Sequence, residues 1–370
     1  MSRKGKIGVG IIGAGWIAKK GHIAGFKSHE EAEIVAICGR TREKVEKVAQ
    51  EYGILRVFTD YRELLELKEI DVVTIATPDY LHYPMTMDAI AAGKHIICEK
   101  PLAMNYAQAR EMYEKAEARG LFHMTGFTWR FTPMAIKIRE LVEAGFLGRV
   151  FHVTASTLLG FGGYRKEPRT VSHPISGFLA GAGSHLIDLT MSFAGGIQTV
   201  CGDAAQHIKE PPLWIESGGE VRKSESDDST TFLARFESSA QGMFHTSRVA
   251  TGEPAAGFMR IAICGDRGGL VHELKVGPGC TSQVLASTLG EGSFKPVPPS
   301  EPYWRNWDST SYDANIPYCW EKLTGEMLRA IKTGAKPQGT FYEGMKSQEI
   351  IDAVLLSSQE QRWVPLPLTG

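Results

Sequence analysis

Residues 11–18 read IIGAGWIA and continue an apolar run that begins at Ile7. A strand that ends in G-x-G-x-x-[G/A] and leads into a helix is the fingerprint of a dinucleotide-binding turn. Gly13 permits the tight turn, Gly15 lets backbone N–H groups approach a pyrophosphate, and Ala18 is small enough for close packing of helix on strand. The pyrophosphate would then lie at the N-terminus of the helix. The residues expected to contact it are Gly13, Gly15, Trp16 and Ile17.

The next hundred residues alternate short apolar strands with amphipathic helices. Strands are predicted at residues 33–38, 71–76 and 95–98, and helices at 83–92 and 106–116. Continuously apolar strands that alternate with helices indicate a parallel sheet covered on both faces. The sequence therefore predicts a Rossmann domain, a doubly wound α/β fold, over residues 1–126.

The second half of the chain has a different pattern. Residues 151–159, 230–236, 241–249 and 259–264 are β-rich segments bounded by turn-forming stretches. Strands that follow one another without intervening helices indicate a largely antiparallel sheet. We expect residues 127–370 to form an α+β domain with an open-faced sheet.

Apolar side chains on that open face predict self-association. The residues expected to be exposed there are Phe232, Leu233, Phe244 and Ile263. A large uncovered apolar surface is uncommon on a monomer. The sequence therefore predicts a homodimer or homotetramer formed through the second domain.

Composition is that of an ordinary enzyme with two domains. The chain has 370 residues, 43% of them hydrophobic, and a formal net charge of −1. That charge gives no electrostatic reason to expect a nucleic acid or a membrane surface as partner. The six cysteines show neither C-x-x-C nor a metal-ligand spacing, so we expect no metal and a reducing compartment. The basic first six residues lack a signal-peptide cleavage site after them, which favours the cytoplasm.

Four separate motifs resemble one known family. They are the fingerprint, the T-P-x-x-x-H turn of residues 77–82, the E-K-P motif of residues 99–101 and the G-x-H-x-x-D segment of residues 183–188. On these motifs the chain resembles the glucose–fructose oxidoreductase / inositol dehydrogenase (Gfo/Idh/MocA) family over nearly its whole length. The resemblance implies NAD(P)-dependent oxidation or reduction of a sugar, polyol or related carbohydrate. It also implies that the second domain binds substrate and mediates oligomerisation.

Two residues are the candidate catalytic groups. Hydride transfer from a secondary alcohol needs a base for the hydroxyl proton and a cation near the oxygen. Lys100 follows a predicted strand at the carboxyl edge of the sheet, where ligands bind in open α/β folds, and in the family the matching lysine contacts the reacting hydroxyl. His185 is the candidate general base, because the unperturbed pKa of histidine near neutrality suits proton transfer, although its apolar neighbours also fit a core histidine. Asp188 shares a helix face with His185 and could orient it.

The cofactor edge is expected to use Thr77, Pro78, His82, Glu99 and Lys100 beside the fingerprint. One position there departs from the usual NAD pattern. NAD-binding members end the second strand with an acidic residue for the ribose 2′-hydroxyl, whereas this chain has Gly39 followed by Arg40. An arginine offers donors for a 2′-phosphate, and it could also stack on the adenine. We therefore expect NADP or NAD as cofactor, with NADP slightly favoured.

A second departure concerns the substrate. The family often carries an aspartate four residues before the histidine, and this chain has Gly181 there. The glycine supplies no carboxylate and leaves room for a larger substrate group, which favours a glycoside or a modified sugar. Further substrate contacts are expected from Trp129, Arg130, Tyr164, Arg165 and Asp188.

Two other function classes stay open from the sequence. One is a redox-neutral lyase, epimerase or glycosidase that keeps NAD bound and passes through a transient 3-oxo intermediate. The other is a non-catalytic nucleotide sensor, which the presence of both Lys100 and His185 disfavours.

Overall fold

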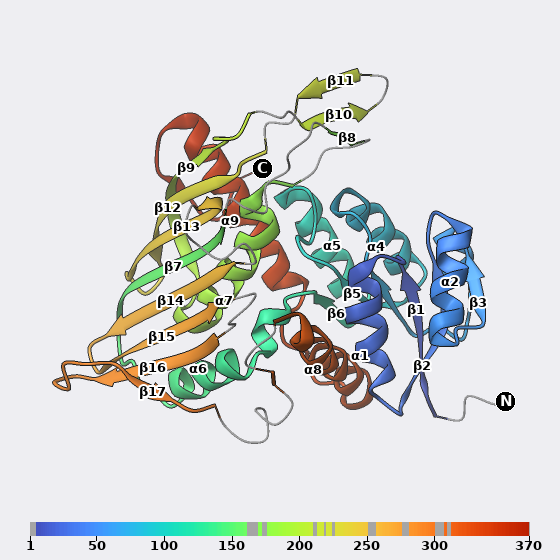
Figure 1. The fold of residues 1–370 in the computed structure, drawn as a ribbon, viewed down its shortest axis with the longest axis horizontal. Coiled ribbons are helices and arrows are strands. Elements are labelled where there is room, and N and C mark those ends of the chain that lie inside the picture. Colours follow the sequence, from blue (N-terminus) through green and yellow to red (C-terminus); the bar gives the residue numbers. More distant parts are fainter. Residues whose placement is uncertain are drawn as a thin grey trace. The chain divides into compact units, whose positions relative to one another are not determined.

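A computed structural model gives the fold of the chain (Figure 1). It describes residues 5–160, 169–171, 176–209, 213–217, 220–223, 226–250, 257–275, 281–299, 307–308 and 312–369. Contacts divide the chain into two compact units. The first comprises Met1–Phe131 with Ala314–Lys346, and the second comprises Thr132–Asp313 with Ser347–Gly370.

The first unit is built on a parallel sheet, in which the described residues form six strands in the order β3-β2-β1-β4-β5-β6. The strands are β1 (Ile7–Ile12), β2 (Ala32–Cys38), β3 (Arg56–Phe58), β4 (Val72–Ile75), β5 (His95–Cys98) and β6 (His123–Thr125). All residues of the central strands β1 and β4 are buried, as their continuous apolar character predicts. This confirms the predicted Rossmann sheet. The strand order reverses between β1 and β4, and ligands bind at the carboxyl ends of the strands at such a point.

Helices cover the two faces of this sheet. They are η1 (Ala18–Ile23), α1 (Ala24–Lys27), α2 (Arg42–Tyr52), α3 (Tyr61–Leu65), η2 (Asp79–Leu81), α4 (His82–Ala91), α5 (Tyr106–Ala118), η3 (Thr128–Phe131) and most of α8 (Tyr312–Thr333). In Figure 1, α4 and α5 lie on one side of the sheet and α1 and α8 on the other. The helix after the fingerprint is π-helical over η1 and continues as α1.

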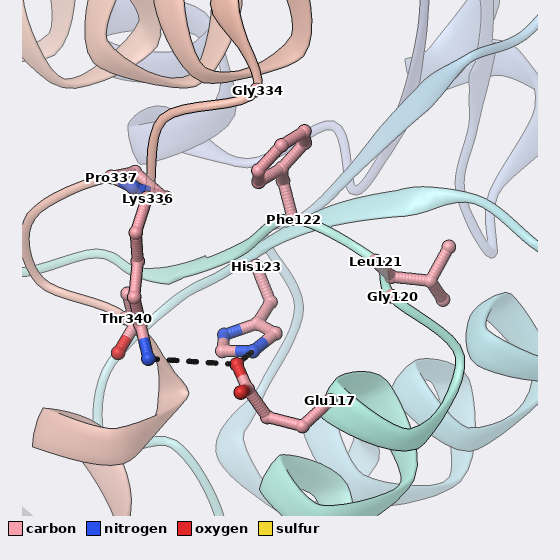
Figure 2. Close-up of a pocket in the computed structure, with 9 residues that line it drawn as sticks. All are labelled: Glu117, Gly120, Leu121, Phe122, His123, Gly334, Lys336, Pro337 and Thr340. Atoms are coloured by element: carbon pink, nitrogen blue, oxygen red, sulfur yellow. Dashed lines mark hydrogen bonds and ion pairs between the residues drawn. The ribbon is translucent and has the colours of Figure 1, made fainter.

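Part of the C-terminal region packs with the first unit, whereas the sequence led us to expect everything after residue 126 in the second. Thr125 N donates to the carbonyl oxygen of Gly339 at 2.8 Å, and Phe341 N donates to Nδ1 of His123 at 3.0 Å. The rings of His123 and Phe341 stack at 4.8 Å. Figure 2 shows His123 beside the segment that joins α8 to the next helix. These contacts fasten that segment to β6.

The second unit contains a mixed, mostly antiparallel sheet. Nine strands of the described residues form it in the order β17-β16-β15-β14-β7-β13-β12-β9-β18, and only the pair β7–β13 is parallel among them. The strands are β7 (Val150–Gly160), β9 (Ile197–Ala205), β12 (Ser229–Phe236), β13 (Gln241–Ala250), β14 (Phe258–Gly265), β15 (Gly268–Lys275), β16 (Thr281–Thr288), β17 (Lys295–Val297) and β18 (Val364–Pro365). A small separate sheet joins β8 (Arg169–Val171), β10 (Leu213–Ser217) and β11 (Glu220–Lys223). The predicted α+β architecture is confirmed.

Helices cover one face of the large sheet. They are α6 (Pro133–Glu143), η5 (Leu179–Gly183), α7 (Ser184–Ala194) and the greater part of α9 (Phe341–Glu360). α7 contacts β7 and β14, and α6 contacts β15 and β16 (Figure 1). α9 runs along β9, where Ser357 Oγ accepts a hydrogen bond from Gly202 N at 2.9 Å.

The side chains expected on the open face lie mostly on the helix-covered face. Phe232, Phe244 and Ile263 are each at most 1% exposed, so the expectation that they form an exposed apolar surface is wrong. Phe232 and Phe244 stack directly across β12 and β13 at 4.4 Å. Because side chains alternate between faces, Leu233 and its cross-strand partner Met243 are 47% and 52% exposed on the other side. The sequence shows that the side chains alternate between two faces, but it does not show which of these faces the helices cover.

Within the parts of the chain that the structure describes, no helix is long and apolar enough to cross a membrane.

Candidate active site

The turn after β1 has the form that a pyrophosphate requires. Gly13 has φ of +122°, and a Cβ at this position would collide with the carbonyl oxygen of Ala76. In contrast, no heavy atom of the described chain lies within 4 Å of the place that a Cβ at Gly15 would take. Helical geometry begins directly after Gly15, so the backbone N–H groups of Trp16 and Ile17 stand at a helix N-terminus. The turn therefore fits the phosphates of a dinucleotide.

The end of β2 carries a cation beside this turn. Gly39 follows β2, and a Cβ there would lie 2.9 Å from Cγ2 of Val45 and 3.4 Å from Cβ of Ala14. Arg40 is exposed. Burial raises the pKa of Tyr80 in η2, and the positive charge of Arg40 opposes that shift, so the two side chains are electrostatic neighbours. Arg40 therefore lies close to the first turn of the T-P-x-x-x-H segment.

The T-P-x-x-x-H turn is held by its histidine. His82 is 1% exposed, and its Nδ1 and Nε2 lie 2.8 Å and 3.0 Å from the carbonyl oxygens of Pro101 and Thr77. Because both ring nitrogens are occupied by backbone groups, we infer that His82 positions the two loops and does not contact the cofactor directly. Pro78 is exposed beside it. The hydroxyl of Thr77 is buried and has no hydrogen-bond partner in the described structure, which fits a polar group of the cofactor as its partner.

The E-K-P motif follows β5, at the same edge of the sheet. Glu99 is 8% exposed, and its Oε2 accepts a hydrogen bond from Lys100 N at 3.0 Å. Its Oε1 lies 3.4 Å from Nε2 of His22. The peptide bond between Lys100 and Pro101 is cis. The carboxylate is therefore fixed by contacts from two different elements.

The charge state of Lys100 is set by opposing effects. Burial lowers the pKa of the Lys100 ammonium group, while the carboxylates of Glu99 and Asp79 raise it, and the net pKa is below the ordinary value of 10.5. Burial raises the pKa of Glu99, but the opposing effects of His22 and Lys100 are larger. The net pKa is below the ordinary value, so Glu99 remains ionised. A lysine with a lowered pKa beside a fixed carboxylate is typical of a functional site.

The segment after β6 supplies two further predicted residues of the first unit. Trp129 and Arg130 lie in the short helix η3. Arg130 is 7% exposed, and its Cδ lies 3.4 Å from the place that a Cβ at Gly339 would take. Trp129 is partly buried.

His185 and Asp188 lie on one helix of the second unit. They are 6% and 1% exposed and stand one turn apart on α7. The helix begins before α7 with the π-helical η5, and Asp227 Oδ2 accepts a hydrogen bond from Leu179 N at 2.9 Å at its start. Gly181 lies in η5, and the described residues place no heavy atom within 4 Å of a Cβ built on it. Tyr164 and Arg165 lie outside the described residues.

Several residues at these sites were not singled out from the sequence. Asp227 is one, because nothing in its local pattern links it to a helix start 48 residues earlier. His22 is another, and its contact with Trp320 joins segments that are about 300 positions apart in the chain. A hint was available for His22, since it lies four residues after the fingerprint and is followed by the small and apolar residues 23–26. Among the residues with described positions, no group of three or more metal-ligating side chains could hold a metal ion.

The fold and the turn after β1 define a dinucleotide-binding protein with a second α+β unit. Comparison with known proteins gives the family. Residues 7–127 match the oxidoreductase family with an NAD-binding Rossmann fold, and residues 135–271 match the Gfo/Idh/MocA C-terminal domain. These two matches together cover more than half of the chain, and the chain belongs to the Gfo/Idh/MocA family of oxidoreductases, as its motifs predict.

Curated relatives include two named dehydrogenases. The chain is 26% identical over 389 residues to levoglucosan dehydrogenase of Pseudarthrobacter phenanthrenivorans, covering 98% of both chains. It is 33% identical over 192 residues to D-glucoside 3-dehydrogenase of Escherichia coli, covering 50% of this chain and 54% of the relative.

Solved structures share the fold over the whole chain. Levoglucosan dehydrogenase in complex with NADH superposes with a TM-score of 0.85 at 23% identity, covering 98% of this chain and 100% of that one. An oxidoreductase domain protein from Kribbella flavida superposes with a TM-score of 0.83 at 27% identity, again with 98% and 100% coverage.

Proposed function

We propose that the protein is an NAD(P)-dependent dehydrogenase that transfers a hydride between the cofactor and a secondary hydroxyl or ketone of a sugar, polyol or glycoside. The observation that carries the proposal is Lys100, a lysine with a lowered pKa at the carboxyl end of β5, next to a carboxylate whose two oxygens are both engaged. Levoglucosan dehydrogenase and D-glucoside 3-dehydrogenase among the relatives support a carbohydrate as the substrate.

In this reaction Lys100, His185 and Asp188 have separate roles. A nicotinamide bound at this edge would supply the acceptor for the hydride of the alcohol carbon. The Lys100 ammonium group stabilises the negative charge that develops on the substrate oxygen. His185 takes the hydroxyl proton as general base, and Asp188, one turn along the helix, orients its ring.

The cofactor is held by the edge described above. Gly13, Gly15, Trp16 and Ile17 bind the phosphates, Thr77 offers its hydroxyl, and Arg40 lies at the end of β2. We infer that NADP binds at least as tightly as NAD, because no acid follows β2 and the guanidinium of Arg40 can pair with a 2′-phosphate.

The space at Gly181 bears on the substrate. A residue with no side chain one turn before His185, around whose Cβ position the described residues place no heavy atom within 4 Å, supports room for a substituent on the sugar ring. We therefore favour a glycoside or a modified sugar over a free monosaccharide.

A substrate screen tests the proposed function. Sugars, polyols and glycosides are offered with NAD and with NADP, and reduced nicotinamide is followed by its absorbance. Net reduction with at least one carbohydrate is expected. Carbohydrate conversion without net change of the cofactor would instead indicate a redox-neutral lyase, epimerase or glycosidase.

Assembly and location complete the proposal. The pair Leu233 and Met243, exposed on the face of the sheet opposite Phe232 and Phe244, supports a homodimer or homotetramer, and light scattering that reports a monomer at micromolar concentration would contradict it. The buried free thiols of Cys38 and Cys98 support a reducing compartment, hence the cytoplasm, and cell fractionation tests this.

A further inference from the structure

His22 lies buried behind the E-K-P motif. It is 0% exposed, and its two ring nitrogens contact two different elements of the sheet. Nδ1 contacts the hydroxyl of Thr74 on β4, and Nε2 lies 3.4 Å from Oε1 of Glu99. Burial lowers the pKa of His22, so the ring is neutral near pH 7. In the tautomer in which Thr74 donates to Nδ1, the ring proton is on Nε2 and faces Oε1 of Glu99 at 3.4 Å, which is longer than an ideal hydrogen bond.

A tryptophan from the other end of the chain holds this ring in place. The rings of His22 and Trp320 lie 3.8 Å apart with an interplanar angle of 39°. Trp320 can come so close because the neighbouring residue is Gly21, where a Cβ would collide with the indole. A Cβ at Gly25, one turn on, would likewise lie only 2.8 Å from the carbonyl oxygen of Trp320. The helix of η1 and α1 is therefore packed tightly on α8.

The π-helical turn aims the histidine at the sheet. Residues 18–23 form η1 directly after the phosphate turn. A π-turn contains one residue more than an α-turn and so changes the direction in which the following side chains point. His22 is in this turn, and its ring reaches both β4 and the residue after β5. Such turns occur frequently at functional sites.

The Glu99 carboxylate lies between His22 and Lys100 and contacts both residues. Its Oε1 is next to His22 and its Oε2 accepts from Lys100 N, so the carboxylate has one orientation. There is little other space for it, since a Cβ at Gly126 would lie 3.2 Å from Oε2. The charged and titratable groups that act on these side chains are Asp79, His82, Glu99 and Lys100.

We propose that His22 is a positioning residue for Lys100, which acts through Glu99 and is itself held by Trp320. The inference deepens the proposed function, on which it rests for the role of Lys100 in the reaction. Loss of the His22 contact removes the polar neighbour of Oε1 from the buried Glu99 carboxylate, which favours the neutral form of Glu99. Lys100 then loses the negative neighbour that keeps its ammonium form charged.

Chemical labelling of Lys100 tests the proposal without any substrate. The full-length protein is acetylated with a small reagent over a range of pH, and the peptide that contains Lys100 is quantified by mass spectrometry. Only the neutral amine reacts, so the profile gives the pKa of Lys100. His22→Leu and Glu99→Gln should both move the profile to lower pH, and a shift of one unit makes labelling about tenfold faster at a fixed pH below the pKa.

Three further variants make the test specific. His22→Gln keeps an N–H donor with enough reach for Glu99 and should retain the wild-type profile, whereas His22→Asn is too short and should resemble Glu99→Gln. The double variant His22→Leu/Glu99→Gln should match Glu99→Gln alone, because His22 acts only through that carboxylate. His29→Leu is the matched control, since His29 also contacts α8, with Nε2 2.9 Å from the Glu321 carbonyl oxygen. It should leave the profile unchanged.

The possible results separate this proposal from the proposed function. If His22→Leu does not fold, as judged by circular dichroism, the comparison of His22→Asn with His22→Gln decides. Wild-type labelling in a folded His22→Leu or His22→Asn variant, or additive shifts in the double variant, would overturn the positioning role even if the wild type is an active dehydrogenase. A shifted profile in a protein that oxidises no carbohydrate would leave the positioning role in place and reject the proposed function.

Discussion

The ring of His82 connects two loops of the cofactor edge, with Nδ1 2.8 Å from the carbonyl oxygen of Pro101. Nε2 lies 3.0 Å from the carbonyl oxygen of Thr77 on the other side. A carbonyl oxygen only accepts, so both ring nitrogens donate when the ring is an imidazolium. Burial by itself lowers the pKa of His82, but Cys98 and the two carbonyl groups raise it to about 9.

This raised pKa predicts that the free energy of unfolding decreases as the pH becomes alkaline. Because the folded pKa of about 9 is above the ordinary 6.5, the contribution of His82 is complete below pH 6.5 and is lost as pH rises through 9. His82→Leu should lower the free energy of unfolding by about 1–3 kcal/mol for each donor lost and should remove this pH dependence. Denaturant unfolding at a series of pH values measures both. If the free energy of unfolding depended on pH in the same way in wild type and variant, His82 would be neutral in the folded protein.

His123 offers the opposite case in the same unit. Its Nδ1 accepts from Phe341 N at 3.0 Å, and Nε2 lies 2.8 Å from Oε1 of Glu117, which also lies 3.7 Å from Nζ of Lys336 (Figure 2). Burial lowers the pKa of His123, so its contribution is present above the ordinary pKa of 6.5 and is lost as pH falls below it.

His123→Leu should therefore destabilise the protein by about 1–3 kcal/mol near neutral pH. The loss should be smaller in acid, where the wild type also loses the acceptor for Phe341 N. Limited proteolysis should find increased cleavage between α8 and α9, since His123 helps to fasten that segment to β6. Cleavage elsewhere with no change in this segment would contradict the assigned role.

The strands of the first unit differ in how clearly their residues indicate them. Buried parallel strands read as continuous apolar runs, so β1, β2, β4 and β5 were predictable. β3 was missed because it has only three residues and starts with the exposed Arg56. The catalytic candidates depended on motifs that resemble a family, since neither Lys100 nor His185 differs locally from a surface lysine or a core histidine.

Long-range contacts account for most of what the sequence did not predict. Phe232 and Leu233 alternate along β12, but only the helices packed on one face decide which of them is buried. Trp320 joins the first unit through a contact with His22, almost 300 residues away in the chain. Local propensity has no information about such pairs.

Arg40 gives a direct prediction on the choice of cofactor. Arg40→Ala should weaken binding of NADP by about tenfold or more and change binding of NAD little, because only NADP carries the 2′-phosphate that a guanidinium pairs with. Fluorescence titration with both nucleotides measures the two constants. Arg42→Ala, in which the lost side chain is paired with Glu46 at 3.0 Å, is the control for a general change in surface charge. A strong preference of the wild type for NAD would contradict the role of Arg40.

Lys100 gives a prediction on rate and on its pH dependence. Lys100→Met should bind the nucleotide almost normally and lose on the order of a hundredfold or more in kcat, because it removes the charge that stabilises the substrate oxygen. Since the pKa of Lys100 is lowered, the wild-type rate should fall on the alkaline side at a pH below 10.5. Lys100→Arg keeps the charge at all accessible pH and should lose that alkaline fall. An alkaline limb that is the same in Lys100→Arg and wild type would assign it to another group.

His185 is tested most sharply together with Gly181, four residues earlier. His185→Ala should cut turnover by on the order of a hundredfold and leave nucleotide binding unchanged. Near-full activity of that variant on the true substrate would make His185 a core residue.

Gly181→Asp restores the acid that relatives often carry, and it should fold, because the described residues leave a Cβ there free of any neighbour within 4 Å. A carboxylate one turn before His185 favours the imidazolium, so the acidic limb of the rate profile should move to higher pH. Gly181→Asn has the same size without the charge and should leave the limb in place. If a substituent of the substrate occupies this space, both variants should lose more activity on large glycosides than on small sugars. Equal losses on all substrates would show that the space at Gly181 has no part in recognition.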